Sequence, residues 1–82
     1  MITARQSRAA RALLGWTQET LAEKALVSLT ALKRLESESG LKVYETTRDQ
    51  VRRAFEANGI VFLNSDQGEG VMFVRAKIDS RK

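Results

Sequence analysis

The sequence contains no cysteine and no histidine among its 82 residues. The first absence excludes disulfide bonds and cysteine-ligated metal sites. The second removes the commonest general base and the commonest zinc ligand. Catalysis would need a pair of carboxylates, and the acidic residues are spread along helix surfaces. We therefore expect no metal site, no cofactor and no enzymatic activity.

Proline, internal repeats and low-complexity tracts are also missing, so we expect one compact unit. Eighty-two residues allow a small domain with a modest core. No run of about eighteen apolar residues is present, which predicts that the chain does not cross a membrane. The first residues are basic but lack the apolar centre of a secretion signal, and we expect a cytoplasmic location.

The chain is basic, with a formal net charge of +4 and a pI near 10.0. This balance favours a polyanionic partner. The alternative is that the charges only solvate the surface, and charge alone does not separate the two interpretations. The positions of the cations decide between them.

The segment from 17 to 36 has the spacing of two short helices joined by a tight turn. Thr17 can cap the first helix through its hydroxyl group, and apolar residues then recur every three to four positions. Ser28 can cap the second helix in the same way. Only Leu26 and Val27 lie between the helices, so the pair must cross sharply rather than run side by side.

The second of these helices has an apolar side and a polar side. The apolar side carries Leu32 and Leu35. The opposite side carries Thr30, Lys33 and Arg34. A crossed helix pair with hydrogen-bonding and cationic groups on its outer face suits insertion into the major groove of DNA.

A longer helix is predicted on each side of this pair. The first covers residues 4–14, begins with a capping box of Thr3 and Gln6, and ends at the glycine that follows it. The second begins between residues 43 and 47 and ends at Asn58. Its arginines could contact phosphates, although a run of this kind is more often a solvated face.

The residue pattern changes after the last helix. The runs 60–63 and 71–74 are rich in β-branched and aromatic residues, and a polar, glycine-rich segment of seven residues separates them. This pattern predicts a hairpin with a mobile loop. We divide the chain into a helical DNA-binding domain, a hairpin that could serve in dimerisation, and a frayed basic tail, at residues 1–59, 60–77 and 78–82.

The stretch LLGWTQETLAEKALVSLTALKRLE, residues 13–36, resembles the helix-turn-helix domains of the lambda-repressor, Cro and Xre type. The resemblance extends over about residues 2–63. It implies a mainly α fold: a four-helix lambda-repressor-like helix-turn-helix domain, here with a C-terminal β-hairpin. One position departs from the family, because Leu26 stands where a turn glycine with positive φ is usual. A leucine there should cost about 1–2 kcal/mol.

The resemblance also implies which residues bind DNA. Gln18 corresponds to the glutamine that contacts the phosphate backbone and braces the reading helix. Arg34 can donate two hydrogen bonds to guanine. Leu29 is either an apolar contact to thymine methyl groups or a core residue. The predicted DNA-binding residues are Thr17, Gln18, Ser28, Leu29, Thr30, Lys33, Arg34 and Lys42.

Arg11 and Glu36 match the positions at which relatives hold a buried salt bridge. The pair would hold the first helix against the reading helix. Arg11 is therefore left out of the predicted DNA contacts in spite of its charge.

These features predict a small sequence-specific DNA-binding transcriptional regulator. We expect a repressor that binds an inverted repeat in double-stranded DNA through the helix at 28–36. A single reading helix covers few base pairs, so a homodimer is expected. The alternative is a protein-interaction module, such as an antitoxin or antirepressor, with the hairpin as the edge that binds a protein partner.

Overall fold

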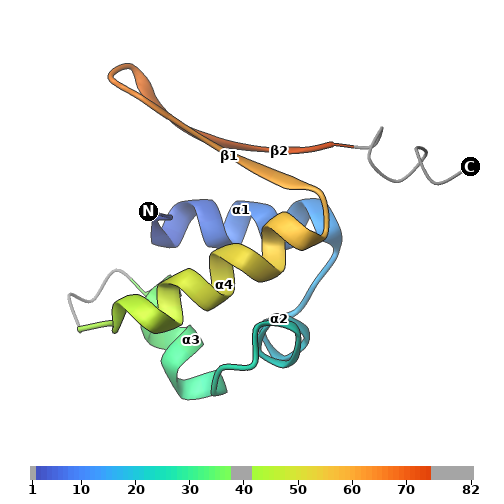
Figure 1. The fold of residues 1–82 in the computed structure, drawn as a ribbon, viewed down its shortest axis with the longest axis vertical. Coiled ribbons are helices and arrows are strands. Elements are labelled where there is room, and N and C mark those ends of the chain that lie inside the picture. The colour runs from blue at the N-terminus through green and yellow to red at the C-terminus, as the bar shows by residue number, and fades with distance from the viewer. Residues whose placement is uncertain (1, 38–41, 75–82) are drawn as a thin grey trace, which may run out of the picture.

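The computed structural model describes residues 2–37 and 42–74. Four helices are followed by a two-stranded antiparallel hairpin, so the predicted fold class is confirmed (Figure 1). The elements are α1 (Ala4–Leu14), α2 (Gln18–Ala25), α3 (Leu29–Glu36), α4 (Glu45–Ala57), β1 (Ile60–Ser65) and β2 (Gly68–Phe73). Within these residues, no helix has both the length and the apolar character of a membrane span.

The limits of α1 follow from its capping residues. Thr3 accepts a hydrogen bond from the backbone N–H of Gln6, and the side chain of Gln6 accepts one from the backbone N–H of Thr3. Gly15 then adopts the left-handed conformation, with φ 69° and ψ 29°, which ends the helix. Both the capping box and the glycine stop agree with the sequence-based prediction.

The turn between α2 and α3 contains a leucine in a backbone conformation that leucine rarely adopts. Leu26 has φ 59° and ψ 43° and is 82% exposed. Its backbone N–H donates to Glu23, and Val27 donates to Ala22, which closes the end of α2. The turn therefore keeps the geometry of a glycine turn although it has no glycine, and Leu26 has no packing that offsets the strain.

The strands of the hairpin are longer, and its loop shorter, than the sequence indicated. β1 and β2 pair from Ile60 opposite Phe73 to Ser65 opposite Gly68, and only Asp66 and Gln67 connect them. The predicted seven-residue loop was therefore wrong, because five of its positions belong to the strands. Residues 75–77 of the predicted hairpin segment and the tail at 78–82 lie outside the described residues.

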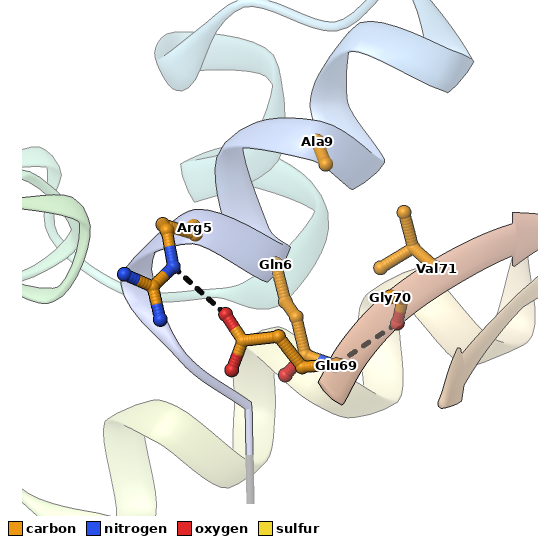
Figure 2. A pocket seen from close by; sticks show the side chains of 6 residues that line it. All are labelled: Arg5, Gln6, Ala9, Glu69, Gly70 and Val71. Carbon is orange, nitrogen blue, oxygen red and sulfur yellow. Dashed lines mark hydrogen bonds and ion pairs between the residues drawn. The ribbon is translucent and has the colours of Figure 1, made fainter. Parts of the chain in front are cut away.

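Contacts with α1 explain why the polar and glycine residues of the predicted loop are held in an extended conformation within the hairpin. Gln6 is buried, and its Nε2 lies 2.9 Å from the carbonyl oxygen of Gly70 and 3.2 Å from that of Leu63. Glu69 accepts a hydrogen bond from Arg5 at 2.9 Å (Figure 2). It accepts another from Thr3 at 3.1 Å. These tertiary bonds outweigh the weak strand preference of the segment.

The core lies where α1, α2, α3 and α4 meet beneath the hairpin (Figure 1). Phe55 of α4 is fully buried at its centre. Its ring stacks on Trp16 and meets Phe62 of β1 edge to face, with a centroid separation of 5.9 Å in both cases. The aromatic series joins the loop before α2, the last helix and the hairpin into one hydrophobic cluster.

Candidate nucleic-acid interface

The outer face of α3 is open to solvent. Thr30, Lys33 and Arg34 are exposed, whereas Leu32 and Leu35 are buried beneath them. Figure 1 shows α3 at one side of the molecule and the hairpin at the other, with α1 and α4 between them. The hairpin therefore does not cover the predicted reading face.

The N-termini of the two central helices are capped by side chains. The hydroxyl of Thr17 accepts from the backbone N–H of Thr20, and that of Ser28 accepts from Ala31, at 3.0 Å in each case. Thr17 and Ser28 are both exposed. They set where α2 and α3 begin, and the partial positive charge of each helix N-terminus is directed outward.

Leu29 is half-buried and packs against the hydrophobic core. This placement favours the second of the two interpretations of this residue, as a core residue. The exposed surface of α3 consequently begins at Thr30.

The cations of α3 and of the segment after it are not paired with an acidic side chain in the described part of the chain. Lys33, Arg34 and Lys42 form no ion pair with any residue in 2–37 or 42–74. A concentration of uncompensated positive charge on one exposed surface is the electrostatic requirement for binding a phosphate backbone.

The arginines of α4 have a different environment. Arg52 pairs with both Asp49 and Glu56, and Arg53 pairs with Asp49 at 2.9 Å. The hydrogen bond to Asp49, followed by that to Glu56, raises the pKa of Arg52 above its usual value. Arg48 donates to the carbonyl of Ile2 at 2.8 Å. Local pairing of this kind favours a solvated face rather than a phosphate-binding one.

A cleft of about 120 Å³ lies between α3 and the start of α4. Its polar lining residues are Ser28, Thr30, Arg34, Lys42, Tyr44 and Thr47. Helical spacing puts Tyr44 and Thr47 on the same side as the apolar residues of α4, so neither is among the residues predicted to bind DNA. Tyr44 is instead 72% exposed, since it is the N-cap of α4 and precedes the helical face. The sequence signal that could have identified Tyr44 as a site residue was its position two residues after Lys42, a predicted DNA-binding residue.

Behind the exposed face, the carboxylate of Glu36 is buried and bound by side chains of two other segments, α1 and the start of α2. Arg11 lies 2.9 Å away through Nη2, and Gln18 donates from Nε2 at 3.0 Å. Ser7, itself fully buried, donates from its hydroxyl at 2.5 Å. The backbone oxygen of Glu36 accepts from Arg8, also at 2.5 Å. These bonds fix the end of α3 relative to α1 and to the start of α2.

Ser7 was not identified from the sequence as part of this cluster. A serine inside an amphipathic helix gives no indication of a carboxylate that lies 29 residues later. Gln18, predicted at the DNA backbone, directs its amide nitrogen toward Glu36. It therefore braces α3, and the second N–H of its amide is the side-chain donor left for a phosphate oxygen.

The described residues contain no cluster of three or more side chains suited to hold a metal ion. In a comparison with known families, residues 8–42 match the family described as helix-turn-helix. The matched span covers the second half of α1, all of α2 and α3, the turn between them and the segment up to Lys42. No curated protein matches the chain.

Proposed function

Since residues 8–42 belong to the helix-turn-helix family of the lambda-repressor and Xre type, we propose that this DNA-binding protein is a sequence-specific transcriptional repressor. It binds double-stranded DNA by inserting α3 into the major groove. The alternative, a protein-interaction module, is one outcome of the experiment below.

The observation that carries the proposal is the exposed face of α3. A helix with its side chains is about 10–12 Å across, which suits a major groove about 12 Å wide. Thr30, Lys33 and Arg34 share this face, and no acidic side chain pairs with either cation among the described residues. Arg34 can donate two hydrogen bonds to the O6 and N7 of guanine, and Thr30 can meet a base or a thymine methyl group.

Contacts to phosphate position the helix. Lys42, Tyr44 and Thr47 line the cleft beside α3 together with Arg34. We assign these three residues to the DNA backbone, because a hydroxyl or ammonium group beside the reading helix can bind a phosphate oxygen. Thr17 and Gln18 serve a second phosphate at the N-terminus of α2.

A helix of this length reads only a few base pairs, so we propose a homodimer on an inverted repeat with half-sites about one helical turn apart. Repression follows if the bound dimer covers a promoter. A protein of this kind acts on DNA in the cytoplasm.

A salt titration tests the proposal. Binding to a pool of random duplexes and to a duplex selected from that pool is measured by fluorescence anisotropy over a range of salt concentrations. The proposal predicts a selected sequence bound about 10³-fold more tightly than random DNA, with affinity that falls steeply as salt increases.

The matched control is Arg53→Ala, which removes the same charge from α4 at a position already paired with Asp49. It should leave binding almost unchanged, whereas Lys33→Ala should weaken it. Absence of any sequence preference at every salt concentration would contradict the proposal and favour the protein-interaction module.

A further inference from the structure

The hairpin has an inner face that packs on the helices and an outer face that nothing in the described chain covers. The outer face carries Val61, Leu63 and Met72, which are 39%, 48% and 47% exposed. Val61 lies opposite Met72, and Leu63 lies opposite Gly70. A two-stranded hairpin is marginally stable by itself, and an apolar strand with an open edge is a site for pairing with another chain.

The open edge of β2 can be identified from the hydrogen bonds across the hairpin. The backbone N–H of Val74 donates to the carbonyl of Gly59 at 2.7 Å. Because the directions of backbone groups alternate along an antiparallel strand, those of Glu69, Val71 and Phe73 point away from β1. Outside the hairpin, none of these groups has a backbone partner among the described residues.

A cleft of about 240 Å³ runs beside this edge. Figure 2 shows Arg5, Gln6 and Ala9 of α1 on one side of the cleft and Glu69, Gly70 and Val71 of β2 on the other. Ala9 is small and leaves space opposite Val71. The cleft therefore gives access to the outward backbone groups of β2 and has room for an additional side chain.

We propose that β2 of a second copy of this chain pairs antiparallel with β2 about a two-fold axis at Val71, so that the two hairpins form one four-stranded sheet. The inference rests on the proposed function, which requires a two-fold dimer. In this register Val71 faces Val71 of the second copy, Gly70 faces Met72, and Glu69 faces Phe73. The outward backbone groups of the three residues then all gain partners.

The side chains on the outer face fit this register. Gly70 has no side chain, so the Met72 side chain of the second copy can lie over it. Across the four strands, Val61, Met72, Gly70 and Leu63 form one apolar row, and the two-fold axis repeats the row in reverse order. On the inner face, Val71 of the second copy enters the space beside Ala9.

Charge also favours a second copy over nucleic acid. Glu69 is the one ionisable residue in β1 and β2, and it is already paired with Arg5. The register places it beside Phe73 rather than beside another Glu69, so no like charges meet. With the charge of Glu69 compensated within each copy, two such edges can approach each other, whereas a polyanion would find no cation in these strands.

Sedimentation of the protein without DNA tests the inference separately from DNA binding. The protein concentration runs from about 1 to about 200 µM, because an edge of three residues is a small interface that should associate in this range. Wild type should pass from monomer to dimer. Gly70→Lys and Met72→Lys should each raise the dimer dissociation constant at least about tenfold. A Cβ at Gly70 would meet only Leu63, at 3.9 Å, so the monomer should keep its thermal midpoint.

Val61→Lys is the matched control, because it places the same charge on the same outer face but on β1, away from the joined edges. It should dimerise as wild type does. A wild-type protein that stays monomeric would overturn the inference. It would also be overturned if Val61→Lys weakened the dimer as much as Gly70→Lys and Met72→Lys do, a result that would indicate face-to-face packing of the hairpins. Failure to bind DNA by a protein that dimerises as described would instead contradict the proposed function alone.

Because the chain has no cysteine, a single introduced cysteine tests the register. Residues that face each other in a hydrogen-bonded antiparallel pair have Cα atoms about 5.5 Å apart, within the range of a disulfide. Val71→Cys should cross-link two copies on mild oxidation, and Gly70→Cys should not, because it faces Met72. Cross-linking of Gly70→Cys but not Val71→Cys would contradict the register.

Discussion

The side-chain amide of Gln18 donates a hydrogen bond to the carboxylate of Glu36, with 3.0 Å between Nε2 and Oε1. The same carboxylate is bound by Arg11 and Ser7 of α1. The last residue of the proposed reading helix is therefore tied to the start of α2 and to the middle of α1. The orientation of α3 relative to α1 and α2 depends on this cluster, although none of its buried groups needs to contact DNA.

Arg11→Ala should destabilise the protein by about 3–5 kcal/mol, because it leaves the buried carboxylate of Glu36 without its cation. The side chain of Glu36 is only 2% exposed, so water cannot replace the lost partner. Urea denaturation followed by circular dichroism measures the effect. Arg53→Ala is the control, since its guanidinium is 74% exposed and its loss should cost less than about 1 kcal/mol. Equal stabilities of the two variants would show that the cluster is not structural.

Leu26→Gly should stabilise the protein by about 1 kcal/mol, because it removes the strain of a leucine at positive φ. The exposed side chain contributes little packing that would be lost. An increased urea midpoint with an unchanged denaturant slope is the expected result. Glu23→Gly, in the last helical turn of α2, is the control and should instead lower the stability of the protein by about 1 kcal/mol. A destabilised Leu26→Gly variant would show that the leucine makes a favourable contact.

Gln6→Ala should release the hairpin from α1. The substitution removes the donor to the carbonyls of Leu63 and Gly70, together with one half of the capping box, and should cost about 1–3 kcal/mol. Faster amide exchange in β1 and β2 than in α4 is the expected readout. Gln50→Ala, at an exposed position of α4, should change exchange in neither element.

Acid should weaken the contact between the hairpin and α1. The hydrogen bond from Arg5, assisted by that from Thr3, lowers the pKa of Glu69 below its usual 4.5. A group with a lowered native pKa stabilises the fold above its unfolded pKa, and the stabilisation is lost as pH falls through the native pKa. The stability difference between wild type and Glu69→Gln should therefore be present at neutral pH and vanish in acid. Because the pair is exposed, added salt should reduce the difference. A difference that grows toward acid pH would contradict this assignment.

Local signals explain why much of the fold was predictable. Thr3, Gly15, Thr17 and Ser28 act on the backbone within a few residues of themselves, and α1, α2 and α3 begin or end where they indicated. The apolar spacing likewise indicated which side of α3 is buried. These properties belong to short segments and need no knowledge of the rest of the molecule.

The features that were missed depend on residues far apart in the sequence. Asn64, Glu69 and Gly70 have low strand preference, and they are extended because Gln6 and Arg5 bind them from α1. Ser7 meets Glu36 through the fold alone. A sequence pattern contains no information on such pairs until the helices are placed.

The most direct test of base reading by α3 is a panel of duplexes in which each position of the selected site is changed in turn. Equilibrium affinities are measured for wild type, Arg34→Ala and Lys42→Ala. The account predicts that Arg34→Ala loses about 1–3 kcal/mol of discrimination at one base position, and that Lys42→Ala weakens all duplexes alike with a smaller salt slope. An Arg34→Ala variant that keeps the full wild-type preference at every position would contradict the assignment of α3 as the reading helix.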